Sequence, residues 1–313
     1  MASSPIPALK VLEQSTVSPP NSSVPETSIP LSFCDLMWLN LNNVERIFFY
    51  SIPAISTSHF VKHLLPSLKT SLSLTLQHFF PLAGHVIFSP NSDCGKFQYQ
   101  YKDGDSISFT VAESDRDFTH LAGDDARSVI ELESFVPTLA AVSADATPLM
   151  AVQVTVFPSQ GICLGLTINH GACAYVWTCQ VWARGLPSNQ VAWLGFLVNA
   201  KRVGEILGRV IDGLGDGVLR DVVDAWVEMG KIVKYERPLL VLGSPGFRFY
   251  DSDFGCGRPV KVEVVSLKNT EAMSISEGKG GGGIGIGMTA PKMEMEMFSF
   301  EFAEGLDQLL HSF

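Results

Sequence analysis

The segment Leu166–Trp177 reads LTINHGACAYVW and joins two different local patterns. Asn169 and His170 lie between a strand-like segment and a turn of small residues, which is followed by an aromatic-rich helix start. Apolar side chains alternate along the strand that leads into the turn, as on a strand with one buried face: Ile162, Leu164, Leu166 and Ile168. A histidine at the exit of a buried strand is held rigidly, still reaches a cleft and titrates near neutral pH. His170 is therefore a candidate general base, and a histidine with a purely structural hydrogen bond is the alternative.

Composition limits the classes of protein to consider. The chain has 313 residues, enough for one large domain or two ordinary ones. Its hydrophobic content of 46% and charged content of 17% predict a folded core rather than a disordered chain. With a formal net charge of -10 and no evident basic surface, we expect no nucleic-acid partner.

Targeting signals and cysteines indicate the compartment. Residues 1–8 lack the basic-then-apolar pattern of a secretion signal, and no apolar run reaches transmembrane length. We therefore expect a cytoplasmic protein with no membrane partner. Six cysteines are scattered without a CxxC pair, which fits a reducing compartment: Cys34, Cys94, Cys163, Cys173, Cys179 and Cys256. His170 and Cys173 have HxxC spacing, but no second pair completes a tetrahedral zinc site, so we expect no metal.

Strand-like segments are spread over the whole chain. Alternating or short apolar runs predict the following strands: Leu9–Glu13 (at a sheet edge), Arg46–Tyr50, Lys96–Tyr101, Ser106–Ala112, Ala151–Phe157, Ile162–Ile168, Val191–Val198, Leu239–Leu242 and Val260–Val265. The turn Pro158–Gly161 predicts a hairpin, and the glycine-dense segment Lys279–Gly287 predicts a flexible one.

Helical patterns lie between these strands. Thr57 or Ser58 caps a pattern that continues to Phe79, in which Pro66 fits the first turn of a second helix. The segment Pro81–His85 ends that helix, and His85 is expected to be a loop histidine. Further helices are predicted over residues 205–231 and 293–310. The sum is a mixed α/β protein without regular βαβ alternation, which argues against a Rossmann sheet. GxSxG and P-loop patterns are absent, so hydrolase and NTPase activities have no local support.

Several segments together resemble the plant BAHD acyltransferases, in particular the branch that acylates anthocyanins and other phenolic glucosides. Asn169-His170 corresponds to the histidine of the family's HxxxD motif, and Asp253–Gly257 (DFGCG) is similar to its DFGWG block. The remaining similar segments span nearly the whole chain: Leu31–Trp38, Val44–Tyr50, Leu68–Ser73, Phe80–Gly84, Leu242–Pro245 and Lys261–Ser266.

The resemblance implies a two-domain chloramphenicol acetyltransferase-like fold. Residues 1–172 would form the N-terminal domain, ending at the HxxxD-like histidine. Residues 173–313 would form an incomplete C-terminal domain that contains the DFGWG-like loop.

The same resemblance implies an acyl-CoA-dependent O-acyltransferase. Malonyl-CoA would be a co-substrate rather than a bound cofactor, a phenolic or flavonoid glucoside would be the acceptor, and the chain would act as a monomer. His170 would be the general base. Asp253, Phe254, Gly255, Cys256 and Gly257 would form a structural loop. Five basic residues are candidates for binding the phosphates of coenzyme A, and ordinary solvated surface charges are the alternative: Lys201, Arg202, Lys231, Lys234 and Arg237.

The chain also departs from the family pattern. Ala174 stands where HxxxD has its Asp, and Cys256 stands where DFGWG has its Trp. Family members are longer, which indicates one internal deletion at about Ala172 and a second gap after Arg202. Loss of the Trp predicts local destabilisation of a few kcal/mol if the site is buried. An impaired or inactive remnant that binds a ligand, and an incomplete gene model, therefore stay open as alternatives to an active enzyme.

Overall fold

The computed structural model describes residues 9–31, 39, 42–88, 97–140, 146–170, 172, 197–198, 240–243, 248–269, 272–280 and 283–310. Backbone contacts divide the chain into two compact units. The first comprises Met1–Ala192 with Arg248–Ser266, and the second comprises Trp193–Phe247 with Leu267–Phe313. Residues 248–266, which follow the predicted boundary at Ala172, thus group with the N-terminal residues, and that boundary stays a prediction.

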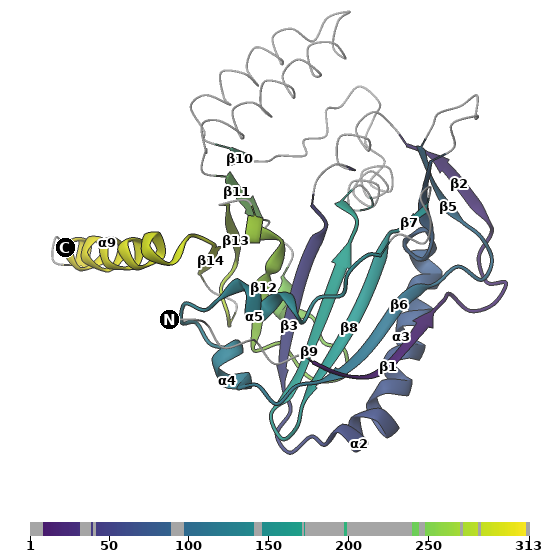
Figure 1. Cartoon of the computed structure of the whole chain (residues 1–313), viewed down its shortest axis with the longest axis horizontal. Helices are drawn as coiled ribbons and strands as arrows, with labels where there is room; N and C mark the ends of the chain where they lie inside the picture. Colours follow the sequence, from purple (N-terminus) through teal and green to yellow (C-terminus); the bar gives the residue numbers. More distant parts are fainter. Residues whose placement is uncertain are drawn as a thin grey trace, which may run out of the picture. The chain divides into compact units, whose positions relative to one another are not determined.

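A six-stranded sheet forms the centre of the first unit (Figure 1). Its strands lie in the order β1 (Lys10–Val17), β6 (Ile107–Glu113), β8 (Met150–Phe157), β9 (Gly161–Ile168), β3 (Val44–Ser51) and β12 (Lys261–Val264). Only the β6–β8 pair of this sheet is parallel. The predicted edge strand and the predicted hairpin between β8 and β9 are confirmed, and the described strands of this sheet do not alternate regularly with helices.

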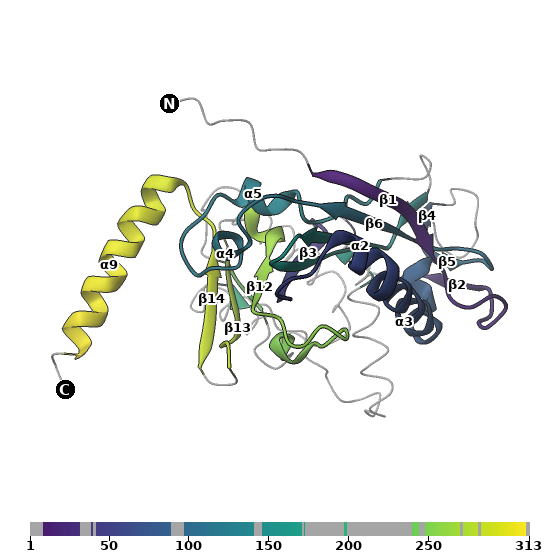
Figure 2. The same ribbon diagram turned by 90° about the horizontal axis from the view of Figure 1, so that it is seen from below.

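Both faces of this sheet are covered, because the central strands carry apolar side chains on alternate sides. Phe48 and Tyr50 of β3 belong to a core that includes residues of α3 (Leu65–His78). Ile47 and Phe49 belong to a core on the other face, with residues of α4 (Phe118–Leu121) and α5 (Val129–Glu133). Figure 2 shows α3 and α5 on opposite sides of the strands. The period-2 alternation of the sequence therefore sorts side chains between two cores rather than between core and water.

The first helical run begins at Ser56, whose hydroxyl accepts a hydrogen bond from the backbone N–H of His59 at 3.2 Å. This cap lies one or two residues before the predicted one. A π-helical segment η1 (Phe60–Leu64) separates α2 (Thr57–His59) from α3. Pro66 lies in the first turn of α3, as predicted, where a missing N–H costs no helical hydrogen bond.

The helix ends in the 3₁₀ turn η2 (Phe80–Ala83), followed by Gly84. A Cβ at Gly84 would lie 2.1 Å from the carbonyl oxygen of Gln100, so only glycine fits this close approach. The expectation of a loop histidine was wrong for His85, which is the first residue of strand β4 (His85–Phe88). Its Nδ1 lies 3.8 Å from a carboxylate oxygen of Asp105.

A smaller sheet completes the first unit, in the order β2 (Thr27–Pro30), β5 (Phe97–Tyr101), β4 and β7 (Ala146–Pro148). Val86, Tyr99, Leu149 and Ala172 form its buried cluster. Strands β2, β4 and β7 have three or four residues each, which is too short for a clear alternation pattern.

The second unit contains a four-stranded sheet in the order β10 (Leu197–Val198), β11 (Leu240–Gly243), β13 (Met273–Glu277) and β14 (Ile284–Met288). Strands β13 and β14 confirm the predicted glycine-dense hairpin, and α9 (Lys292–Leu310) confirms the predicted C-terminal helix. The predicted helix over 205–231 and most of the predicted strand Val191–Val198 lie outside the described residues.

Candidate functional site

His170 lies two residues after the end of β9, and the pairing of β9 with β3 decides what lies beside it. Val44, the first residue of β3, pairs with Ile168, the last residue of β9. This register brings the segment before β3 next to the turn after β9. The imidazole Nδ1 of His170 lies 3.1 Å from the carbonyl oxygen of Asn42.

This hydrogen bond fixes the form of the imidazole ring. A carbonyl oxygen only accepts, so Nδ1 carries the hydrogen and the lone pair of the neutral ring is on Nε2. Burial lowers the pKa of His170, and the hydrogen bond to Asn42 opposes this with a smaller effect. His170 is therefore neutral near pH 7, in the form that accepts a proton at Nε2.

Buried contacts on both sides of His170 hold the turn in place. Thr167 donates its hydroxyl to the carbonyl of Pro137 at 2.5 Å, and the N–H of Asn169 donates to the carbonyl of Leu149 at 2.8 Å. After the histidine, Ala172 is only 2% exposed. Neighbours anchored in this way restrict the backbone of His170, as a catalytic base requires.

The other candidates of this region are not all placed. Ala174, Cys173 and the five candidate cations for coenzyme A lie outside the described residues. Sequence reasoning missed Asn42, because its contribution is a backbone carbonyl, which carries no side-chain signature. Only the pairing of two strands distant in sequence could have indicated it.

The loop Asp253–Gly257, for which the sequence predicts a structural role, is held by hydrogen bonds between its own residues. One carboxylate oxygen of Asp253 accepts hydrogen bonds from the N–H groups of Gly255 and Gly257, at 2.8 and 3.0 Å. Both glycines have positive φ, +86° and +81°, in the region that side chains with a Cβ rarely adopt. The aspartate and the two glycines therefore specify one loop conformation together.

This loop packs on the end of β3 that is remote from His170. The ring of Phe254 makes edge contacts with Phe48 and Tyr50, with ring centroids 6.5 and 6.1 Å apart. Tyr50 donates its hydroxyl to the carbonyl of Ser252 at 3.3 Å. Because β3 rises about 3.3 Å per residue, its two ends are roughly 20 Å apart. The loop thus packs on β3 toward the end that is far from the candidate base.

Cys256 is half-buried and borders an open hollow of about 490 Å³. The hollow is lined by Ser51, Ile52, Pro53, Ala54, Ile55, His59, Leu64, Gly255 and Cys256. Burial, with a smaller contribution from Asp253, raises the pKa of the Cys256 thiol, so the group is neutral. The hollow is open space beside the small side chain of Cys256.

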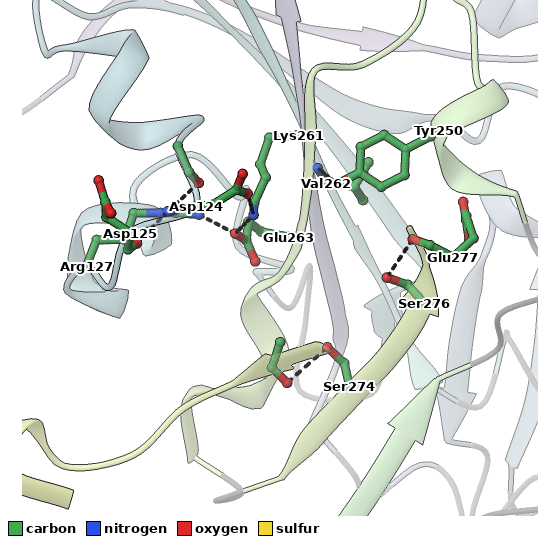
Figure 3. A network of polar contacts seen from close by, with 12 residues as sticks. Asp124, Asp125, Arg127, Tyr250, Lys261, Val262, Glu263, Ser274, Ser276 and Glu277 are labelled. Carbon is green, nitrogen blue, oxygen red and sulfur yellow. Dashed lines mark hydrogen bonds and ion pairs between the residues drawn. The ribbon is translucent and has the colours of Figure 1, made fainter. Parts of the chain in front are cut away.

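An ion-pair network fastens β12 to the loop between α4 and α5 (Figure 3). Arg127 pairs with Glu263, and its guanidinium also donates to the carbonyls of Gly123 and Asp125 at 2.7 and 2.9 Å. Lys261 lies 2.5 Å from an oxygen of Asp124 and 3.5 Å from one of Glu263. The network connects chain segments more than a hundred residues apart at the edge of the sheet.

Neither a metal site with three or more protein ligands nor a membrane-spanning helix is found in the part of the chain that the structure describes. No group of three or more His, Cys, Asp or Glu side chains there is arranged to hold a metal ion. Among the described helices, none combines the length and the apolarity needed to cross a bilayer.

The sequence matches proteins of one family. A family model described as "Transferase family" matches residues 9–173, more than half of the chain. Over 223 residues, the chain is 36% identical to malonyl-CoA:anthocyanidin 5-O-glucoside-6''-O-malonyltransferase of Arabidopsis thaliana, covering 70% of this chain and 47% of the relative. It is 40% identical over 171 residues to malonyl-coenzyme A:anthocyanin 3-O-glucoside-6''-O-malonyltransferase of Dahlia pinnata, covering 53% and 37%.

A relative named for different substrates is equally similar. Agmatine coumaroyltransferase of Arabidopsis thaliana is 42% identical over 165 residues, which cover 52% of this chain and 36% of the relative. The chain thus spans between about a third and a half of the length of these curated relatives.

Solved structures share the fold. Vinorine synthase has a TM-score of 0.56 with this chain at 16% identity, over 92% of this chain and 96% of its own. F. graminearum TRI101 complexed with coenzyme A and T-2 mycotoxin has a TM-score of 0.50 at 10% identity, over 88% and 97%. At these identities the likeness is one of fold.

Proposed function

Since this chain belongs to the Transferase family of BAHD acyltransferases, with the chloramphenicol acetyltransferase-like fold, we propose that it transfers an acyl group from acyl-coenzyme A to a hydroxyl group, with His170 as the general base. The observation that carries the proposal is the environment of His170. Its ring is buried enough to stay neutral, its tautomer is fixed by Asn42, and its backbone is anchored on both sides.

The proposed reaction needs the two substrates and His170 but no bound cofactor. Nε2 of His170 takes the proton of the acceptor hydroxyl while that oxygen attacks the carbonyl carbon of the thioester. The tetrahedral intermediate then collapses with cleavage of the C–S bond. The coenzyme A sulfur leaves and takes the proton from the imidazolium, which regenerates the neutral base. A general base of this kind contributes about 10²–10⁴-fold to the rate.

The proposed substrates are malonyl-CoA and the hydroxyl of a phenolic or flavonoid glucoside. Two relatives at 36% and 40% identity are named as malonyltransferases that act on anthocyanidin or anthocyanin glucosides. The similar identity to a coumaroyltransferase that acts on agmatine means that overall identity alone does not select the donor and acceptor. The specificity proposal therefore needs a direct comparison of donors.

A second candidate function is binding without turnover. It is favoured by Ala174, which stands four residues after His170 at the position of the family's Asp. If that Asp positions the histidine, its absence displaces the base, and a displacement of about 1 Å costs on the order of 10²-fold in rate. On this alternative the fold persists and still binds a small ligand.

The decisive experiment incubates the full chain with malonyl-CoA or coumaroyl-CoA and a panel of phenolic glucosides, and detects acylated product by mass spectrometry. We expect product with malonyl-CoA and none with His170→Ala. His78→Ala, at an exposed histidine in the last turn of α3, is the matched control and should retain turnover. We also expect Ala174→Asp to raise the rate. Absence of product from the wild type and from Ala174→Asp would favour the binding function.

A further inference from the structure

His59 and His63 form a pair of exposed imidazoles near the Ser51 end of β3, remote from His170. They lie four positions apart, one at the end of α2 and one within the π-helical segment η1. Their ring centroids are 4.8 Å apart and the planes are tilted by 41°. Single π-helical turns are rare and frequently mark functional sites.

We propose that His59 and His63 form a binding site for a divalent transition-metal ion of the Ni²⁺, Cu²⁺ and Zn²⁺ class. Imidazole is the protein ligand these ions share, and two histidines at i and i+4 can contact one ion from a single helix face. A nitrogen binds such an ion at about 2.0–2.1 Å, which places each ring centroid about 3.2 Å from it. Centroids 4.8 Å apart then subtend roughly 100° at the ion, between square-planar and tetrahedral angles.

The site has two protein ligands, and water would complete the coordination. Among the described residues, no third His, Cys, Asp or Glu joins the pair in a metal-binding arrangement. His59 lines the hollow of about 490 Å³, which gives room for bound waters. Cys256 borders the same hollow, and burial raises the pKa of its thiol, which disfavours the thiolate form that binds metals. The site is therefore open and exchangeable, unlike a closed structural zinc centre.

Metal binding would stabilise the junction between α2 and η1. The ion would bridge a residue on each side of the junction, and the unfolded chain does not hold the two rings at this separation. A ligand that binds the folded state alone raises the unfolding temperature as its concentration rises above the dissociation constant. The inference is independent of acyl transfer, because the two histidines are remote from His170.

The test titrates NiCl₂ into the full chain, followed by calorimetry and by thermal unfolding. Variants His59→Asn and His63→Asn each remove one imidazole, and His78→Asn removes an exposed histidine in the last turn of α3. We expect His78→Asn to bind like the wild type. Each pair variant should bind at least about tenfold more weakly, since loss of even an outer-shell partner costs 10–100-fold.

Cys256→Ser tests whether the thiol, and not only the two imidazoles, binds the ion. We expect this variant to bind Ni²⁺ like the wild type. Unchanged affinity in His59→Asn or His63→Asn would overturn the proposal. Loss of binding in Cys256→Ser would also overturn it, by making the thiol a necessary ligand. Circular dichroism of each variant before titration shows that the helices are retained, so a loss of affinity reports on the site itself.

Discussion

The imidazole Nδ1 of His170 lies 3.1 Å from the carbonyl oxygen of Asn42, although 128 positions separate the two residues in the sequence. The pairing of β3 with β9 creates this contact, because Val44 and Ile168 end the paired strands at the same edge. The hydrogen bond sets the tautomer, and burial lowers the pKa of the ring. The reactivity proposed for His170 thus depends on a strand pairing.

The lowered pKa of His170 predicts the pH dependence of acyl transfer. Only the neutral ring accepts a proton, so kcat/KM should be constant above the pKa and fall as pH decreases through it. We expect this acid limb below about pH 6.5, the ordinary value for histidine. The same shift makes the folded state bind fewer protons than the unfolded chain, so the contribution of His170 to stability is lost as pH falls through this range.

The measurement is kcat/KM of the full chain against pH, with unfolding monitored at each pH. If kcat/KM already begins to fall above pH 7 while the protein is still folded, the imidazole ring is not buried in the way the structure shows.

Gly165 in β9 leaves no room for a side chain. A Cβ there would lie 1.9 Å from the carbonyl oxygen of Phe135. Gly165→Ala should therefore shift backbone and lower the free energy of unfolding by about 1–3 kcal/mol, as overpacking does. Denaturation in urea measures the change. Ser108→Ala, at an exposed position of β6, is the control and should change stability by less than about 0.5 kcal/mol. Equal stability of both variants would contradict the close approach of the Gly165 backbone to the carbonyl oxygen of Phe135.

The Arg127–Glu263 pair should matter more for stability than the Lys261–Asp124 pair. The side chain of Arg127 is 6% exposed, so Arg127→Met leaves a half-buried carboxylate with Lys261 as its remaining cation. We expect a loss of about 3 kcal/mol, near the lower end for a broken buried pair. The side chain of Asp124 is 82% exposed, so Asp124→Asn should cost less than about 1 kcal/mol. Similar losses from both substitutions would show that burial does not set the difference.

The hollow beside Cys256 predicts that a larger side chain is accepted there. Cys256→Trp would place apolar surface against Ile52, Ile55 and Leu64, and filling a hollow of this kind typically adds about 0.5–2 kcal/mol. Thermal unfolding measures the gain, with Cys256→Ser as the control that adds no volume. Because Cys256 is half-buried, the gain should be smaller than for a sealed cavity. A lower unfolding temperature for Cys256→Trp would show that the loop cannot admit the ring.

Local patterns predicted most of the elements in the described part of the chain. Strands β1, β3, β5, β6, β8, β9, β11 and β12, and the helices α3 and α9, all have strong apolar periodicity or clear end signals. The short strands β2, β4 and β7 were missed, and His85 was placed in a loop, because three or four residues carry too little pattern. The π-helical segment η1 (Phe60–Leu64) had no local signal either.

The sequence by itself determined where the central strands form, that their side chains divide between two faces, and that His170 follows a strand. These properties follow from the spacing of apolar residues along one short segment, which any isolated stretch of chain already contains. The family motifs are short segments of sequence, so they could be identified from the sequence as well. Only the tertiary structure decided that Asn42 sets the tautomer of His170, that β12 joins the N-terminal sheet, and that Arg127 meets Glu263. Each of these contacts joins segments more than a hundred residues apart, and the strand register that creates them depends on all the strands of the sheet at once.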